Sequence, residues 1–292
     1  MIEEQKHNNS TETAILPMQC YVQPFWKHSD IEIYNESNLD TMNRMPDNCI
    51  DLTVTSPPYD DLRIYNGYCF DFENVAKELF RVTKQGGVVV WVIGDKTKSG
   101  TESGNSFRHA LKFMENGWLL NDTMIWVKTN PMPTEASCRY KQTFEYMFVF
   151  SKGKPKTFNP LMEDTKTERK YKSNWGRKGD YMISSTGAER KTAKQKVKGN
   201  VFYYPISVGG ATKDKFAFEH PAIFPEQLAE DHILTWSNEG DVIYEPFAGS
   251  GTTGKMAFIH KRKCIMSEIS SEYCELSKQR LLPYTSNIGL FA

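Results

Sequence analysis

A glycine-rich turn near the carboxyl end of the chain has the residue types and spacing of a nucleotide-binding loop. The six residues GSGTTG at 249–254 match the pattern G-x-G-x-x-G and follow the strand-like run 242–245. Glycine lets the backbone turn tightly and approach a ligand, and a helix that starts at Thr252 would point free N–H groups at a negatively charged group. Glu268, nineteen residues after Gly249, ends the next short apolar run, where a carboxylate can accept hydrogen bonds from ribose hydroxyls. The pattern predicts a site for a nucleoside-containing cofactor; the alternative is a tight turn with a structural role alone.

A second candidate site lies early in the chain, where two prolines follow a predicted strand. The run 50–55 is β-branched and is followed by Ser56, Pro57, Pro58 and Tyr59. Because proline has no N–H group, this loop offers acceptors, namely its carbonyl groups and the Ser56 hydroxyl. Such acceptors suit an exocyclic amino group with two hydrogens, and the Tyr59 ring offers a face on which a base can stack. The alternative is a strand that the prolines terminate for structural reasons.

The elements that must position these two loops alternate between strand and helix patterns, which indicates an α/β fold with a largely parallel sheet. Strands are expected at 31–34, 50–55, 88–93, 119–127, 144–150, 242–245 and 264–267, and helices at 39–45, 72–82, 107–114, 225–236, 252–259 and 272–281. Gly86 and Gly87 are expected to separate a helix from the strand that follows. Because ligands bind at the carboxyl ends of parallel strands, both loops are expected at one edge of the sheet.

The position of the glycine turn indicates a rotated order of elements. Only 38 residues follow Gly254, which is too few for the remaining strands of a nucleotide-binding fold. The other strands must therefore lie upstream, so that the substrate loop comes early and the cofactor loop comes late.

A basic segment interrupts the alternation between Lys152 and Lys198. It holds fourteen Lys and Arg against five Asp and Glu, a net charge of +9, so the rest of the chain carries −9. The aromatic residues in or just beyond it are Phe158, Tyr171, Trp175, Tyr181, Phe202, Tyr203 and Tyr204. A basic face with aromatic side chains suits the phosphates and exposed bases of a nucleic acid. The alternative is a solvated, lysine-rich loop.

The composition excludes several classes of protein. The 292 residues include 36 basic and 36 acidic side chains, so a polyanion would have to be bound by a local basic patch. The longest apolar run, 88–93, is far shorter than the ~18 residues of a membrane-spanning helix, and the polar amino terminus lacks the apolar segment of a signal peptide. The six cysteines form no C-x-x-C pair, which argues against a zinc ribbon and a secreted disulfide framework. We therefore expect a reduced, cytoplasmic protein without a membrane partner.

The runs TSPPY at 55–59 and EPFAGSGTTG at 245–254 together resemble the paired signature of the amino-group DNA methyltransferases, which methylate cytosine N4 or adenine N6. The order, with the Pro-Pro loop first, a basic segment next and the cofactor loop last, resembles the β group of this family. The resemblance covers 31–282, with two departures: Glu245 replaces a usual Asp, and Ser267 a usual Gly. It implies a Rossmann-like, S-adenosylmethionine-dependent methyltransferase fold in circularly permuted order, with an inserted basic DNA-recognition segment.

Four parts of the chain are expected. They are an amino-terminal arm at 1–28, the catalytic part of the methyltransferase domain at 29–151, a basic target-recognition segment at 152–204, and the cofactor-binding part of the same domain at 205–292.

The resemblance also implies a role for each matching residue. The implied catalytic residues are Ser56, Pro57, Pro58 and Tyr59. The implied cofactor-binding residues are Glu36, Phe247, Gly249, Ser250, Gly251, Thr252, Thr253 and Glu268. Contacts with DNA are expected from Trp175, Arg177 and Lys178. The cofactor would be S-adenosyl-L-methionine, the product S-adenosyl-L-homocysteine, and no metal is expected. For Phe247, a plain core position is the alternative.

The activity that the resemblance implies is site-specific methylation of the exocyclic amine of a base flipped out of double-stranded DNA. Ser56 favours cytosine N4, since serine at that loop position is commoner among the N4 enzymes; adenine N6 is the alternative. An RNA or protein N-methyltransferase usually places the cofactor loop first, and an oxidoreductase would leave the Pro-Pro-Tyr loop unexplained. A non-catalytic DNA-binding module would explain the basic segment alone.

Several properties stay open at this point. They are the recognition sequence, pairing into a homodimer, the existence of a cognate restriction endonuclease, and whether the cell is a prokaryote or one infected by a phage.

Overall fold

The computed structural model describes residues 15–19, 22–58, 70–131, 139–166, 170–178, 181–206, 210–220, 223 and 225–286, with only the backbone for 170–178 and 181–191. The chain forms two compact units. The first comprises 1–159 and 200–292, and the second comprises 160–199. Both candidate loops belong to the first unit.

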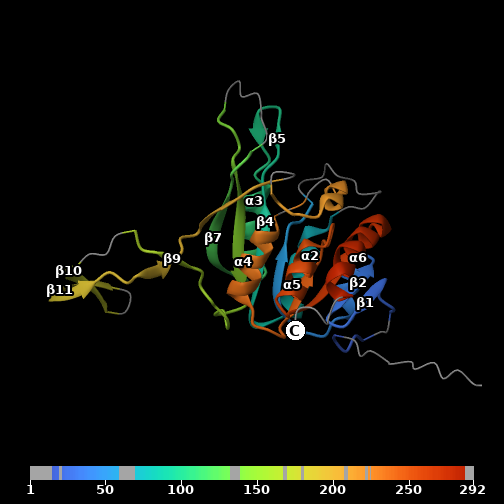
Figure 1. Ribbon diagram of the computed structural model, residues 1–292, viewed down its shortest axis with the longest axis horizontal. Coiled ribbons are helices and arrows are strands. Elements are labelled where there is room, and N and C mark those ends of the chain that lie inside the picture. Colours follow the sequence, from blue (N-terminus) through green and yellow to red (C-terminus); the bar gives the residue numbers. More distant parts are fainter. Residues whose placement is uncertain are drawn as a thin grey trace, which may run out of the picture. The chain divides into compact units, whose positions relative to one another are not determined.

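A nine-stranded sheet forms the centre of the first unit (Figure 1). In spatial order its strands are β1 (Trp26–His28), β2 (Ile31–Asn35), β15 (Lys263–Glu268), β14 (Val242–Glu245), β3 (Ile50–Thr55), β4 (Thr83–Ile93), β8 (Phe144–Ser151), β7 (Leu119–Lys128) and β13 (Val201–Tyr204). The run from β2 to β4 is parallel throughout, and β8 pairs antiparallel with both of its neighbours. This arrangement confirms the predicted α/β fold with a largely parallel sheet.

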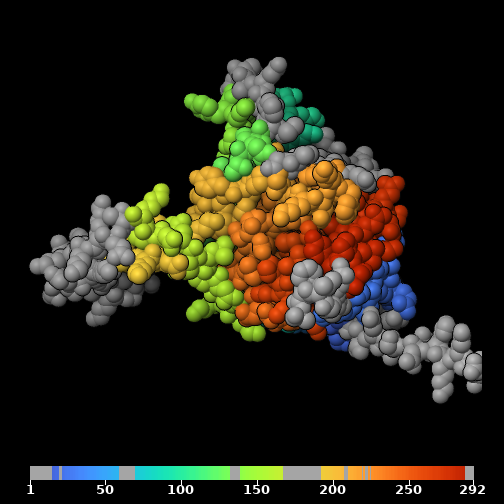
Figure 2. All heavy atoms as spheres, viewed as in Figure 1, coloured from blue at the N-terminus to red at the C-terminus, as the bar shows by residue number. Residues whose placement is uncertain are grey.

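Six α-helices accompany the sheet in the described residues. They are α1 (Asn38–Arg44), α2 (Phe72–Val82), α3 (Asn105–Glu115), α4 (Glu226–Trp236), α5 (Thr252–Ile259) and α6 (Ser271–Thr285). The first three contact one another in chain order, and so do the last three. The last three cover the near face of the sheet, where their atoms appear in orange and red (Figures 1 and 2). Among the described residues, none of the helices has both the length and the apolar character that crossing a bilayer requires.

Local sequence signals explain why α2 matches its predicted bounds. The Asp71 carboxylate accepts a hydrogen bond from the N–H of Asn74 and so caps the first turn. Val75 and Leu79, four residues apart, lie on one face and are buried in the core. The predicted strand at 50–55 and the predicted helix at 252–259 likewise match β3 and α5.

The structure differs from the predicted elements at Gly86 and Gly87, which lie inside β4 and do not separate it from a helix. Gly86 has a φ of +80°, and a Cβ atom on Gly87 would lie 3.0 Å from the carbonyl oxygen of Asp51 in β3. Gly86 therefore suits a backbone conformation that other residues rarely adopt, and Gly87 lets β4 approach β3 closely. A second difference concerns the expected amino-terminal arm at 1–28. Its last three residues, 26–28, form the edge strand β1.

Two aromatic residues expected near nucleic acid belong to the core instead. Phe202 and Tyr204 lie in β13, which pairs parallel with β7, and both side chains are buried. The Tyr204 hydroxyl donates a hydrogen bond to Asp231 at 2.6 Å. The end of the predicted recognition segment, 201–204, is thus a strand of the central sheet, and these two aromatic side chains pack in its core.

The second unit lies within the predicted recognition segment and consists of antiparallel pairs. In it, β9 (Met162–Asp164) pairs with β12 (Gln195–Val197), and β10 (Lys170–Lys178) pairs with β11 (Tyr181–Lys191). The short strands β5 (Thr97–Lys98) and β6 (Thr101–Glu102) and the 3-10 helix η2 (Lys215–Glu219) belong to the first unit.

Candidate active site

The two candidate loops leave the sheet from neighbouring parallel strands. β14 pairs directly with β3 in parallel orientation. β3 ends at Thr55, immediately before the Pro-Pro loop, and β14 ends at Glu245, immediately before the glycine turn. Because the carboxyl ends of parallel strands share one edge of the sheet, both loops begin side by side.

The buried carboxyl group of Glu245 connects these strands with the helix that follows the glycine turn. Its Oε1 accepts hydrogen bonds from the Thr55 hydroxyl and, at 3.0 Å, from the N–H of Phe247. Its Oε2 lies 2.7 Å from Thr253 Oγ1 in α5, and the same Oγ1 lies 3.0 Å from the carbonyl oxygen of Val54 in β3. Burial raises the pKa of Glu245 to about 8. One side chain thus contacts all three elements that form the site.

The glycine turn has backbone angles and surroundings that suit glycine. Gly249 and Gly251 have φ values of +51° and +75°, a region that other L-residues rarely adopt. A Cβ atom on Gly249 would lie 2.9 Å from Nε2 of His220. A Cβ atom on Gly254 would overlap the sulfur of Met266, so this glycine lets α5 pack closely on β15.

Glu268 ends β15 beside the glycine turn, as its spacing predicted. It is 9% exposed, and its two carboxyl oxygens accept hydrogen bonds from the N–H groups of Gly249 and Ser270 at 2.8 and 2.9 Å. Burial raises the pKa of Glu268. A carboxylate has about four acceptor positions, so the two oxygens retain capacity for the hydroxyls of a ribose.

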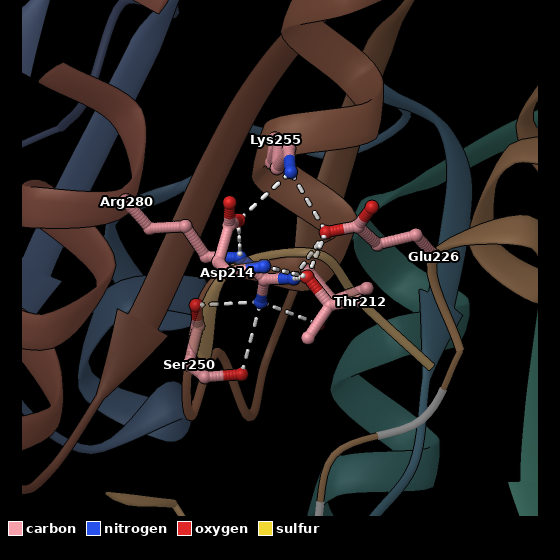
Figure 3. A network of polar contacts seen from close by, with 7 residues as sticks. Thr212, Asp214, Glu226, Ser250, Lys255 and Arg280 are labelled. Atoms are coloured by element: carbon pink, nitrogen blue, oxygen red, sulfur yellow. Dashed lines mark hydrogen bonds and ion pairs between the residues drawn. The ribbon is translucent and has the colours of Figure 1, made fainter. Parts of the chain in front are cut away.

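Arg280 of α6 holds the glycine turn through three hydrogen bonds (Figure 3). Its guanidinium is buried and donates to the carbonyl and hydroxyl oxygens of Ser250, at 3.1 Å each. It also donates to the Thr252 hydroxyl at 2.9 Å. The conformation of the turn therefore depends on a side chain from the last helix.

Arg280 also belongs to a cluster of charged side chains in which the cations are buried and the carboxylates are partly buried (Figure 3). Arg280 and Lys255 both pair with Asp214, at 2.8 Å each, and both pair with Glu226. Although burial opposes ionisation, hydrogen bonds from Lys255 and Arg280 lower the pKa of Asp214. The charges of the two cations and the two carboxylates balance. The ion pairs connect Asp214 and the first residue of α4 to α5 and α6.

A comparison with protein families decides the relationship that the motifs indicated. The family model of the N6/N4 DNA methylases matches residues 50–279, which is most of the chain. The chain belongs to this DNA methylase family. It is an S-adenosylmethionine-dependent DNA methyltransferase of the amino-methylating group, and the resemblance seen in the two loops is confirmed.

Named relatives cover most of the methylase. It is 55% identical over 241 residues to the orphan methyltransferase M.BamHII of Bacillus amyloliquefaciens, which covers 80% of this chain and 89% of that protein. It is 26% identical over 273 residues to the type II methyltransferase M.SmaI of Serratia marcescens, with 80% and 84% covered.

Solved structures match the fold. The cytosine-N4-specific PvuII DNA methyltransferase superposes with a TM-score of 0.69 at 21% identity, covering 89% of both chains. The complex of M1.HpyAVI with S-adenosylmethionine superposes with a TM-score of 0.56 at 23% identity, covering 86% of this chain and 100% of that one. The predicted Rossmann-like methyltransferase fold is thus confirmed.

Two of the predicted cofactor residues have partners within the methylase. Glu36, directly after β2, accepts hydrogen bonds from the Thr41 hydroxyl at 2.6 Å and from the Arg44 guanidinium. Phe247 is half-buried and meets the ring of Phe70 edge-on, with centroids 5.3 Å apart. Their contacts with the cofactor remain predictions.

The catalytic loop is described in part. Ser56 is half-buried and Pro57 is buried, directly after β3, and Pro58 follows them. Tyr59 lies outside the described residues. For the predicted DNA contacts Trp175, Arg177 and Lys178 the structure describes only the backbone, within β10.

Sequence reasoning missed the residues that hold the two loops in place. Thr55 bonds to Glu245 in a different strand, and Arg280 bonds to the glycine turn from the last helix. The TSPPY motif includes Thr55 but not this contact, and neither motif includes Arg280. One signal was available for Arg280, which lies four residues after Leu276 on the buried face of α6. An arginine on a buried helical face usually has a charged or polar partner.

Proposed function

We propose that this methylase transfers a methyl group to the exocyclic amine of a base flipped out of double-stranded DNA, with cytosine N4 as the favoured target. The observation that carries the proposal is the hydrogen bond between Thr55 and Glu245, at the ends of two adjacent parallel strands. It supports a site in which the acceptors of the Pro-Pro loop lie beside a turn suited to a nucleoside cofactor.

The residues around the glycine turn fit S-adenosylmethionine. Gly249 and Gly251 have positive φ angles, and His220 lies too close to Gly249 for a side chain there, so the turn presents its backbone to a ligand. Glu268 has acceptor capacity for a ribose. We assign the amino-acid end of the cofactor to Gly249, Ser250, Gly251, Thr252 and Thr253, its ribose to Glu268, its adenine to Glu36, and its adenosyl face to Phe247. When bound, S-adenosylmethionine supplies an electrophilic methyl group on a sulfonium, and S-adenosylhomocysteine is the product.

The chain's own contribution to the reaction is to position the amine. The Ser56 hydroxyl oxygen and the Pro57 carbonyl oxygen accept the two amine hydrogens and thereby orient the nitrogen toward the methyl group. The same acceptors stabilise the positive charge that develops on the nitrogen until the nitrogen releases one proton to solvent. Pro57 and Pro58 restrict the backbone of the loop, so little reorganisation is needed.

The second unit supports a role in holding DNA. It contains the β10–β11 pair, and a two-stranded ribbon is one of the two elements that the major groove admits. We assign contacts with base or phosphate to Trp175, Arg177 and Lys178. Flipping a base costs a few kcal/mol, which these contacts and stacking on Tyr59 would offset.

Methyl-labelled S-adenosylmethionine tests the function directly. Label is expected in double-stranded DNA, and digestion to nucleosides is expected to yield N4-methylcytosine. N6-methyladenine would replace the favoured target by the alternative, which the family also includes. Label in RNA or protein alone would overturn the proposal.

The setting of the reaction remains a prediction. We propose the cytoplasm of a prokaryotic or phage-infected cell, where the DNA substrate is found. M.BamHII is named an orphan methyltransferase, which favours a methylase that acts without a cognate restriction endonuclease. Pairing into a homodimer is tested by sedimentation velocity, in which a single species of one chain would exclude it.

A further inference from the structure

The Thr253 hydroxyl makes two short contacts with oxygen atoms but has only one proton to donate. Thr253 Oγ1 lies 3.0 Å from the carbonyl oxygen of Val54 and 2.7 Å from Oε2 of Glu245. A hydroxyl has one proton to donate, and a carbonyl oxygen can only accept. If Thr253 donates to Val54, the short contact with Glu245 needs a second proton.

That second proton has a place on Glu245 itself. Oε1 already accepts from the Thr55 hydroxyl and from the N–H of Phe247, which matches the two lone pairs of a carboxyl C=O. Oε2 is then the O–H of the acid and donates to Thr253. In this arrangement every polar atom of the group has a partner, as a buried group requires.

We propose that Glu245 is a neutral carboxylic acid in the folded methylase, a positioning residue whose proton joins Thr253 and holds the glycine turn against the end of β3.

The surroundings of Glu245 favour its neutral form. The side chain is 1% exposed, and burial raises its pKa to about 8. Within the described ranges, the titratable groups that interact electrostatically with Glu245 are Glu268 at the end of β15, Cys264 within β15 and Tyr244 in its own strand. From β3 and α5, the described residues offer it hydroxyl oxygens.

The two cations that flank the glycine turn in α5 and α6 pair with carboxylates other than Glu245. Lys255 and Arg280 pair with Asp214 and Glu226. The two cations thus share two carboxylates whose charges balance theirs, which leaves the proton to neutralise Glu245.

The length of the side chain matters for this role. Glu245 stands where its family usually has Asp, and the additional methylene lets Oε1 contact Thr55 while Oε2 contacts Thr253. An effect on methyl transfer rests on the proposed function, because it assumes that the two connected loops hold the amine and the cofactor.

Infrared difference spectra of the full chain report the proton directly. The wild-type minus E245Q difference at neutral pH is expected to contain the band of a protonated carboxyl group. A carboxylate band in its place overturns the proposal. Failure of E245Q to fold where E245D folds would also count against it, because the amide keeps a carbonyl acceptor for Thr55 and Phe247 and an N–H donor for Thr253.

Stability as a function of pH gives an independent measurement. An acid whose pKa is higher in the folded than in the unfolded chain makes the folded state bind more protons, so stability falls as pH rises from 4.5 toward about 8. The Tm of wild type should therefore fall relative to that of E245Q by about 3 °C per pH unit between about pH 5.5 and 7.5. A constant difference in Tm would contradict a neutral Glu245.

A matched control is available in α4. The carboxyl group of Asp231 is also buried, and it accepts hydrogen bonds from the Tyr204 hydroxyl at 2.6 Å and from Nε2 of Gln227 at 2.9 Å. D231N should keep the wild-type dependence of Tm on pH in this range. If D231N abolishes that dependence as E245Q does, the effect does not belong to Glu245.

The pH profile of methyl transfer connects the proton to the reaction. The wild-type rate is expected to fall above about pH 8 relative to its value at pH 7, and this fall should be absent from the profile of E245Q. If no methyl transfer is detected in any variant, the proposed function fails, while the infrared and Tm results still decide the state of Glu245.

Discussion

Arg280 and Ser250 are in direct contact: the guanidinium donates to both the carbonyl and the hydroxyl oxygen of Ser250, at 3.1 Å each. A residue of the last helix thus determines the shape of a turn that follows β14, thirty positions earlier in the chain. The contact explains why a glycine-rich segment, which is flexible by itself, can present one conformation to a ligand.

Removing the Arg280 guanidinium should weaken both the fold and cofactor binding. R280M leaves Asp214 and Glu226 with one cation in place of two, and breaking a buried ion pair typically costs about 3–5 kcal/mol. Urea unfolding measures this loss, and calorimetric titration should show at least about tenfold weaker binding of S-adenosylmethionine.

Arg262 offers the control for that variant. It is also buried and donates to the Ser237 carbonyl at 2.7 Å and the His260 carbonyl at 2.6 Å. R262M should lose stability but keep its affinity for the cofactor. Equal affinities of R280M and R262M would contradict the role assigned to Arg280.

S56A should slow methyl transfer while cofactor binding is retained. The variant removes one acceptor for the amine, and losing one such preorganised contact costs about 10²-fold in kcat. P57A should act in the same direction, because alanine loosens the loop. Single-turnover rates and the Kd for S-adenosylmethionine separate the effect on methyl transfer from any effect on cofactor binding.

S103A, in which a hydroxyl that donates to Asp95 is removed, is the control. A full rate in S56A refutes the assignment.

Glu268 should make the methylase prefer a cofactor whose ribose has its hydroxyls over one whose ribose lacks them. E268A is expected to bind S-adenosylhomocysteine about 10–100-fold more weakly, as for the loss of hydrogen bonds to a charged group. Wild type should also lose affinity for an analogue whose ribose lacks its hydroxyls, and E268A should not distinguish the two ligands. E272A, at an exposed position in the first turn of α6, is the control. If E268A still prefers the complete ribose, the hydroxyls are bound elsewhere.

Neutralising the basic segment should weaken binding to DNA and its dependence on salt. Lys166, Lys194 and Lys196 are exposed in the second unit. Replacing all three by Gln should reduce the slope of log K against log salt by up to about 3, because each phosphate contact contributes about 0.9. The same change at Lys77, Lys213 and Lys261, exposed in the first unit, should leave the slope unaltered. An unchanged slope in the first variant would mean that these three lysines do not contact DNA phosphates.

The sequence by itself determined the local elements and the identity of the two loops. β3, α2 and α5 begin and end where their patterns predict, because apolar periodicity, the cap at Asp71 and the prolines after Thr55 act within a few residues. The two motifs also indicated the family, since their residue types match the chemistry of an amine acceptor and a nucleoside turn.

Only the tertiary structure decided what holds those loops together. Thr55 and Glu245 are 190 positions apart, and Arg280 and Asp214 are 66 apart. Tyr204 similarly proved to be a core residue through its contact with Asp231. Burial and hydrogen-bond partners arise when distant segments pack against each other, and no window of local sequence contains both members of such a pair.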